Sequence, residues 1–133
     1  MSKLERLLYT SKATEPMGTL ALFNLLNSAR KRNSEVGITG HLLYVDGTFA
    51  QCIEGPPDSI EKLWQSIQHD NRHIDVELVR RTPIDKRRYP EWKMAFSSYR
   101  YLNTLSMPGF FPIDQPGADD LMQLTKNNTT TSR

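Results

Sequence analysis

The sequence predicts an α/β chain of the α+β type: a ferredoxin-like βαββαβ(β) mixed sheet with two helices on one face and a C-terminal segment on the other. Three observations lead to this prediction. The apolar pattern follows the order β-α-β-β-α-β, with one short strand added. The dipeptide Asp46-Gly47 joins two apolar arms and predicts a hairpin with a type I′ turn. The 133 residues are enough for one buried core but too few for two domains.

The first strand and the first helix each bring a polar side chain to the predicted core. Residues 4–10 form a mostly apolar run that ends before Ser11, and alternation turns Tyr9 toward one face of this strand. From about residue 19 to residue 33, apolar side chains recur at helical spacing. Asn33 continues this buried stripe at the C-terminal end of the helix.

The hairpin brings a primary amide to the core. Its arms are residues 40–45 and 48–53, and alternation along the second arm puts Phe49, Gln51 and Ile53 on one face. A buried amide has several donors and acceptors, and each one left unpaired costs about 1–3 kcal/mol. Something polar is therefore expected to face Gln51.

The second half of the predicted domain continues with a helix and two strands. Asp58 is expected to cap the helix, with Glu61 completing a capping box. The apolar residues that follow recur at helical spacing: Ile60, Leu63, Trp64 and Ile67. Residues 74–79 alternate as a half-buried strand, Pro83 is expected in a turn, and residues 92–96 form a final short strand.

The ferredoxin-like plan sets the first and third strands side by side, and we expect them to be parallel. This plan allows Tyr9 and Gln51 to be neighbours on one face, but nothing in the sequence alone fixes their relative height along the strands. Residues 98–126 are expected to pack as a C-terminal extension on the uncovered face of the sheet, because Met107, Phe110 and Phe111 are apolar. Residues 127–133 are polar and are expected to be disordered.

The composition of the sequence argues against several classes of function. No apolar stretch is long enough to cross a bilayer, and the single Cys52 cannot form an internal disulfide, so a reducing cytoplasm is expected. The net charge of +2 comes from basic clusters interleaved with fifteen carboxylates, which disfavours a nucleic-acid surface. No phosphate-binding glycine loop or metal-site spacing is present. Cys52 is expected to be buried and inert, and His41, His69 and His73 to lie at the ends of strands or helices.

What remains is a set of polar side chains at core-facing positions: Tyr9, Asn33 and Gln51. Taken singly, Tyr9 is more often a core aromatic whose hydroxyl finds a carbonyl, and Asn33 is more often a helix-terminal residue. Gln51 is harder to explain in this way, because its whole amide needs partners.

At these positions the sequence resembles the BLUF family, blue-light sensors that use FAD. The resemblance covers about residues 4–97, which form the predicted sensor domain together with the N-terminal residues 1–3. Each matching piece is weak alone, but all of them occur in order and at matching spacing. The pieces are residues 6–11, Asn33 with residues 37–40, and residues 47–55, 70–73 and 92–94.

The resemblance implies a non-covalently bound FAD, with FMN or riboflavin as alternatives, whose ring lies between the two helices. Asn33 would bond the polar edge of the ring, Gln51 would bridge flavin and tyrosine, and Tyr9 would be the redox partner. Trp92 and Met94 would relay the signal along the last strand, although simple core filling explains them equally well. The cofactor-binding set is completed by Ser11, Leu25, Ala29, Arg32, Asp70, Arg72 and His73. Arg32 and Ala29 stand where some relatives carry a histidine and a serine.

The resemblance therefore implies a photoreceptor rather than an enzyme, with a flavin, an unidentified downstream protein and a second copy of the chain as partners. Two alternatives stay open. One is an interaction module of the same fold without useful photochemistry. The other is a ferredoxin-like nucleic-acid binder, which would need exposed stacking aromatics on the sheet. A flavin reductase is disfavoured because no nicotinamide-binding segment is seen.

Overall fold

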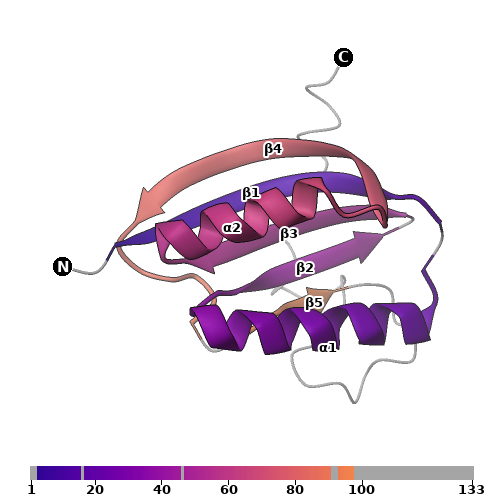
Figure 1. Ribbon diagram of the computed structural model, residues 1–133, viewed down its shortest axis with the longest axis horizontal. Helices are drawn as coiled ribbons and strands as arrows, with labels where there is room; N and C mark the ends of the chain where they lie inside the picture. The colour runs from indigo at the N-terminus through magenta and orange to yellow at the C-terminus, as the bar shows by residue number, and fades with distance from the viewer. Residues whose placement is uncertain (1–2, 16, 46, 91–92, 98–133) are drawn as a thin grey trace.

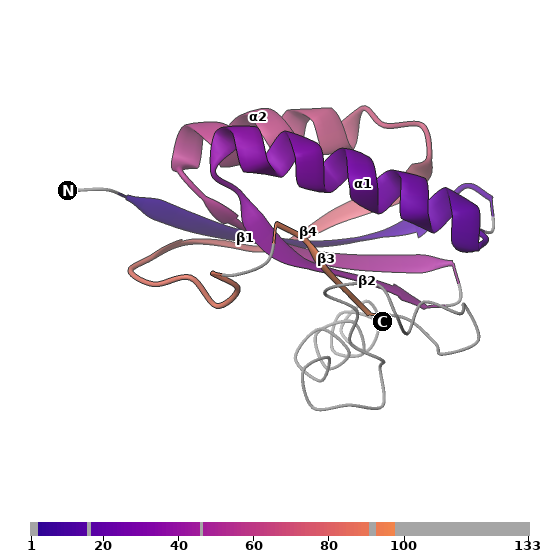
Figure 2. The ribbon, with the colours of Figure 1, turned by 90° about the horizontal axis from the view of Figure 1, so that it is seen from below.

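Two helices cover one face of a five-stranded sheet in the computed structural model, which describes residues 3–15, 17–45, 47–90 and 93–97 (Figures 1 and 2). The sheet has the order β4-β1-β3-β2-β5. Its elements are β1 (Leu4–Ala13), α1 (Thr19–Val36), β2 (Thr39–Val45), β3 (Thr48–Gly55), α2 (Pro57–Gln68), β4 (His73–Ile84) and β5 (Ala95–Ser97). The predicted ferredoxin-like plan is confirmed. Trp92, Asp46 and the predicted C-terminal segment, residues 98–126 and 127–133, lie outside the described residues.

Strands β1 and β3 are neighbours, as expected, but they are antiparallel, so the expectation of a parallel pair was wrong. The reason is topological. The crossover through α1 leaves a one-strand gap between β1 and β2, and the hairpin turns β3 back into this gap. Strand β3 therefore runs against both neighbours. The sheet is mixed because β5 pairs in parallel with β2.

The main core lies between the helices and the sheet, as alternation along the strands predicts. Leu7 and Ile53 meet Leu22 and Leu26 of α1 there, and all four side chains are buried. The apolar face of α2 supplies Ile60, Leu63, Trp64 and Ile67. The opposite face of the sheet carries a second, smaller cluster: Leu8, Leu43, Ala50 and Cys52. Gln51 thus faces the helices and Cys52 faces away from them.

The ends of several elements differ from the predictions. Strand β1 runs on to Ala13 because Ser11 pairs with Phe49 across the sheet. Pro56 is the N-cap of α2, and Asp58 makes no capping hydrogen bond, so the predicted capping box was wrong. A proline at the start of a helix loses no hydrogen bond, which explains the earlier start at Pro57.

Strand β4 is longer than predicted and includes Pro83, which pairs with Glu5 instead of forming a turn. A proline is tolerated there because β4 is an edge strand and needs no donor on its outer side. His69 ends α2 and His73 begins β4, as expected. His41 was expected at an end, but it is buried within β2, with its ring edge-on to Tyr89.

A buried carboxylate fastens the chain between β4 and β5. Glu54 is fully buried and accepts hydrogen bonds from Arg6 Nε at 2.7 Å and from the backbone N–H groups of Arg88 and Tyr89 at 2.9 Å. Arg87 adds a bond of 2.7 Å to the carbonyl oxygen of Gly37. Because a buried charge without partners is costly, these bonds hold residues 87–89 firmly against β2 and β3.

No helix in the described part of the chain is long and apolar enough to cross a membrane. Within the same residues, no group of three or more His, Cys, Asp or Glu side chains is arranged to hold a metal ion.

Strands β2 and β3 lie so close together at Gly40 that adding one methyl group at this residue is expected to lower the stability of the fold strongly. A Cβ at Gly40 would lie 2.1 Å from the carbonyl oxygen of Cys52, whereas a Cβ at Gly18 would meet nothing within 4 Å. We expect Gly40→Ala to lower the free energy of unfolding in urea by about 3 kcal/mol through overpacking. The matched control Gly18→Ala is expected to cost less than about 1 kcal/mol. Equal effects of the two substitutions would contradict the described register of β2 and β3.

Candidate functional site

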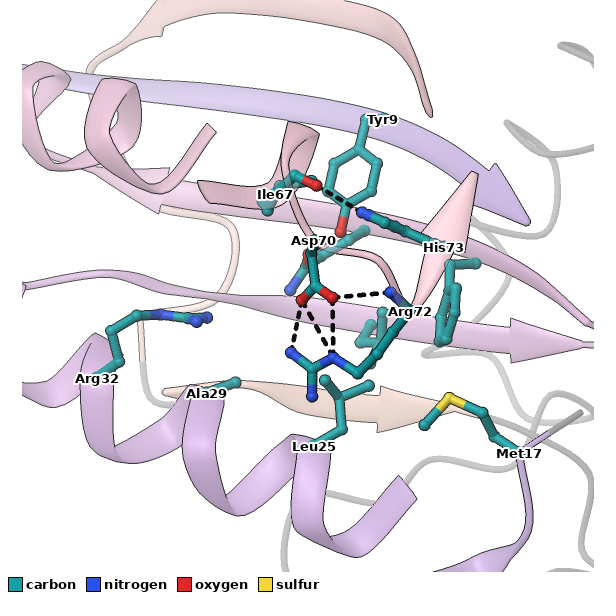
Figure 3. A pocket seen from close by; sticks show the side chains of 12 residues that line it. Tyr9, Met17, Leu25, Ala29, Arg32, Ile67, Asp70, Arg72 and His73 are labelled. Atoms are coloured by element: carbon teal, nitrogen blue, oxygen red, sulfur yellow. Dashed lines mark hydrogen bonds and ion pairs between the residues drawn. The ribbon is translucent and has the colours of Figure 1, made fainter. Parts of the chain in front are cut away.

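A pocket opens on the helix side of the sheet, and Figure 3 shows its lining side chains. Its volume is about 70 Å³. The floor comes from β1, β2 and β3, one wall from α1, and the rim from the C-terminal end of α2 and the residues after it. The lining residues are Tyr9, Met17, Leu25, Ala29, Arg32, Leu42, Phe49, Gln51, Ile67, Asp70, Arg72 and His73. The pocket therefore combines apolar side chains with two polar groups at its floor, Tyr9 and Gln51, and with charged groups on α1 and at the rim.

The floor holds a buried hydrogen bond between two strands. Tyr9 and Gln51 are directly opposite each other in the β1–β3 register, so their side chains leave the same face of the sheet. The Tyr9 hydroxyl donates to Gln51 Oε1 at 2.5 Å, and both residues are buried. The polar partner that the buried amide required is Tyr9.

The other side of the Gln51 amide faces a methionine. Gln51 Nε2 donates to Met94 Sδ at 3.4 Å, and Met94 is fully buried. A thioether sulfur is a weak acceptor, and an amide oxygen turned toward it would gain no hydrogen bond. The Met94 contact therefore favours the orientation in which Gln51 offers its oxygen to Tyr9.

The surroundings of Tyr9 keep it protonated. Burial raises the pKa of Tyr9 well above its ordinary value, although the nearby guanidinium of Arg32 acts in the opposite direction. The hydroxyl is consequently a neutral donor throughout the physiological pH range. Its ring packs against Trp64, with the centroids 5.6 Å apart, and against the edge of His73 at 6.2 Å.

His73 is fixed from both sides of its ring. Nε2 lies 2.6 Å from the carbonyl oxygen of Ile67, which can only accept, so this nitrogen carries a proton. Nδ1 lies 2.8 Å from the hydroxyl of Ser11. Ser11, predicted to bind the cofactor, therefore lies behind His73 and does not line the pocket among the described residues.

Asn33 lies on α1 directly after the pocket-lining Arg32, and it is fully buried. Its Nδ2 donates to the carbonyl oxygen of Lys93 at 2.7 Å, which fixes the orientation of the amide. Of the buried side-chain polar atoms in the described residues, Asn33 Oδ1 alone has no partner. An unpaired buried acceptor costs about 1–3 kcal/mol, so this position calls for a donor.

The rim of the pocket carries charge. Arg72 holds Asp70 through three side-chain contacts, of which Nη2 to Oδ2 is the shortest at 2.6 Å. These hydrogen bonds lower the pKa of Asp70 to about 2. The pair is partly exposed, so it adds little to stability. Because Arg32 also lines the pocket, one positive charge remains in excess at its mouth.

The structure thus brings together most of the predicted site. Tyr9, Leu25, Ala29, Arg32, Gln51, Asp70, Arg72 and His73 all line one pocket, and Met94 touches Gln51. Four lining residues had not been assigned: Met17, Leu42, Phe49 and Ile67. The alternation that placed Gln51 on the core side also placed Phe49 there, and Ile67 belongs to the apolar stripe of α2. Nothing in the sequence pattern singled out Met17.

Comparisons with known proteins agree with this site. The model of the BLUF family, described as sensors of blue-light using FAD, matches residues 4–95. Photoactivated adenylate cyclase subunit beta of Euglena longa is 42% identical over 130 residues, which is 97% of this chain and 14% of that protein. The corresponding subunit of Euglena gracilis is 40% identical over 128 residues, again 14% of its length. The chain therefore spans a small part of these relatives.

Solved structures give the same result. The dark-state structure of BlrB, a BLUF protein, superposes with a TM-score of 0.72 at 28% identity and covers 97% of this chain and 98% of its own. A bacterial light-regulated adenylyl cyclase gives a TM-score of 0.75 at 28% identity over 97% of this chain and 36% of that one. Fold, pocket and matches define a flavin-binding blue-light photoreceptor domain. The chain belongs to the BLUF family.

The residues present suit a flavin in chemical kind, and the pocket of about 70 Å³ admits only part of its ring. The flavin ring carries an imide N–H between two carbonyl groups, which suits the amide of Gln51 in the pocket. Asn33, predicted to bind the cofactor, is not among the lining residues, but its unpaired Oδ1 is an acceptor of the kind that an imide N–H needs. The apolar side chains of Leu25 and Ile67 suit the faces of a flat ring. The excess cation at the mouth suits a phosphate.

Proposed function

We propose that the chain senses blue light by exchanging the hydrogen bonds of Gln51, with Tyr9 as the donor of an electron and a proton. The observation that supports this mechanism is the buried Tyr9–Gln51 bond, with Met94 on the other side of the amide. A bound flavin, once excited, supplies a one-electron oxidant that also takes up a proton. Tyr9 gives up both and later regains both, so no net reaction remains.

The exchange follows from the hydrogen-bonding capacity of each group. Tyr9 now donates to Gln51 Oε1. After loss of its hydrogen, the tyrosine oxygen can only accept, so two acceptors would face each other. Rotation of the Gln51 side chain presents its N–H to Tyr9 and removes it from Met94 Sδ, whereas tautomerisation presents an O–H to Tyr9 and leaves one N–H on Nε2 in place of two. The loss of a hydrogen atom at Tyr9 is thereby converted, when Gln51 rotates, into the loss of a contact with Met94.

Met94 carries the change to the edge of the sheet. It directly precedes β5, which within the described residues pairs with β2 at three positions, from His41–Ala95 to Leu43–Ser97. A segment that is held by few backbone bonds can change its position at low cost. We propose that Met94, together with Trp92, alters the packing of this strand and of the C-terminal extension on the sheet.

Visible spectra of the flavin-loaded protein test the photochemistry. We expect the flavin absorption to shift to the red under blue light and to return in the dark. Tyr9→Phe and Gln51→Leu are expected to abolish the reversible shift, because each removes one partner of the bond. The matched control is Tyr44→Phe, which removes a buried hydroxyl bonded to the backbone of Met17 and is expected to keep the shift.

A yellow protein without a shift would instead favour an interaction module of the same fold. A red shift that persists in Tyr9→Phe would rule out Tyr9 as the donor of the electron and the proton.

We propose that the bound flavin is FAD, since Arg32 and Arg72 at the mouth of the pocket suit the negative charge of its diphosphate. Arg72→Gln is expected to weaken the binding of FAD by about tenfold and to leave riboflavin, which has no phosphate, nearly unaffected. Arg80→Gln is the matched control, because Arg80 is an exposed arginine of β4 that does not line this pocket. Fluorescence titration of the flavin-free protein measures these affinities. Equal losses for FAD and riboflavin would contradict a phosphate-binding role of Arg72.

The proposed output is a protein contact and not a reaction of this domain. The Euglena relatives are subunits of photoactivated adenylate cyclases and are much longer than this chain. We propose that this domain likewise acts on an effector protein in the cytoplasm, or through a rearranged homo-oligomer.

A further inference from the structure

Three side chains hold the two residues before β5. Asn33 Nδ2 donates to the carbonyl oxygen of Lys93, and Gln51 Nε2 donates to Met94 Sδ. The third is Arg30 of α1, whose Nε and Nη2 both donate to the carbonyl oxygen of Met94, at 3.0 and 2.8 Å. Met94 is thus held at its sulfur by Gln51 and at its backbone by Arg30.

The two contacts to Met94 differ in strength. A bond from an amide N–H to a thioether is weak, while a bond from a guanidinium to a carbonyl is charge-assisted and stronger. Two N–H groups of Arg30 converge on one oxygen, and the planar guanidinium fixes its direction. Of the two side chains that bond Met94 directly, Arg30 therefore holds it more strongly, and together with the Asn33 bond to Lys93 it fixes the backbone from which the sulfur reaches Gln51.

We infer that Arg30 is a positioning residue that holds Met94 where its sulfur accepts the N–H of Gln51, and that it thereby sets the rate of return to the dark state. This inference rests on the proposed exchange at Gln51. Restoring the dark arrangement requires an acceptor for Gln51 Nε2, and Arg30 keeps the Met94 sulfur in place to provide it. Among the described residues Arg30 does not line the pocket, and both of its hydrogen bonds to Met94 go to the backbone of that residue.

Two consequences distinguish this role from general stabilisation. The size of the light-induced red shift depends on the flavin, Gln51 and Tyr9, so it is independent of Arg30. The lifetime of the shifted state depends on the position of Met94, so it increases when Arg30 is removed. The other anchor of this segment, Glu54 with the N–H groups of Arg88 and Tyr89, stays intact.

Dark recovery of the flavin-loaded protein after a blue-light pulse tests the inference. Arg30→Gln is expected to recover about threefold to tenfold more slowly with an unchanged red shift, as the loss of charge-assisted bonds predicts. Arg30→Lys retains the charge and one donor, and it is expected to fall between this variant and the wild type. Lys31→Gln is the matched control, since it removes the same charge from the neighbouring exposed position of α1 and is expected to recover at the wild-type rate.

Hydrogen exchange in the dark gives a readout that needs no photochemistry. The backbone amides of residues 93–97 are expected to exchange faster in Arg30→Gln than in Lys31→Gln, while those of residues 87–89 stay unchanged. If Arg30→Gln does not fold, the same comparison is made with Arg30→Lys.

The inference is overturned if the Arg30 variants recover at the same rate as Lys31→Gln, or faster. It is also overturned if exchange increases across the whole domain, because Arg30 would then be a general stabilising residue. Failure of the proposed function is a separate result: the wild type itself would then show no red shift, although the exchange difference at residues 93–97 would remain.

Discussion

The hydrogen bond between Tyr9 and Gln51 is the interaction on which the rest of the site depends. It exists because the antiparallel register of β1 and β3 sets residue 9 directly opposite residue 51. A slip of one residue would turn one of the two side chains to the other face of the sheet. The bond is buried, so neither group can exchange its partner for water. If the Tyr9 hydroxyl loses its ability to donate, the hydrogen bond can therefore be restored only by a change in the Gln51 amide.

The segment that leads into β5 is held by two kinds of anchor. Glu54 binds the backbone at Arg88 and Tyr89 as a fully buried carboxylate, and nothing in the proposed mechanism alters its charge. Gln51 and Arg30 hold Met94, and one of these two contacts is a weak bond to sulfur. Because the Glu54 bonds at residues 88 and 89 stay in place and the Gln51 bond to Met94 can be lost, a change at Gln51 can move Met94 and β5 without unfolding residues 87–89. This difference in bond strength couples the pocket to the edge of the sheet.

Much of the fold and of the site could be predicted from the sequence, because strand and helix periodicity sort side chains by face. Alternation placed Gln51 and Phe49 on the core side and Cys52 on the other, which the structure confirms. The resemblance to BLUF proteins added the rim residues, and Asp70 and Arg72 do meet there. The parallel pairing was wrong, and the sequence predicted only that β3 lies beside β1 with Tyr9 and Gln51 on one face; the antiparallel register that sets the two residues opposite each other came from the structure.

The features that the sequence did not reveal depend on contacts between distant segments. The two bonds from Arg30 to Met94 join residues 64 positions apart, and an arginine in a basic run of an amphipathic helix is usually a solvent-facing residue. Pro83 is typical of a turn, and only the edge position of β4 makes it acceptable in a strand. The buried Glu54 likewise becomes intelligible only when the chain from β4 returns over it.

The most direct measurement is the NMR signal of the Gln51 side-chain amide in flavin-loaded protein labelled with ¹⁵N, assigned by its loss in Gln51→Leu. We expect this signal to move on illumination and to return at the rate at which the absorption recovers. In Tyr9→Phe we expect it to stay still in the light. A Gln51 amide that keeps the same signal in dark and light while the flavin spectrum shifts would contradict an exchange of hydrogen bonds at this residue.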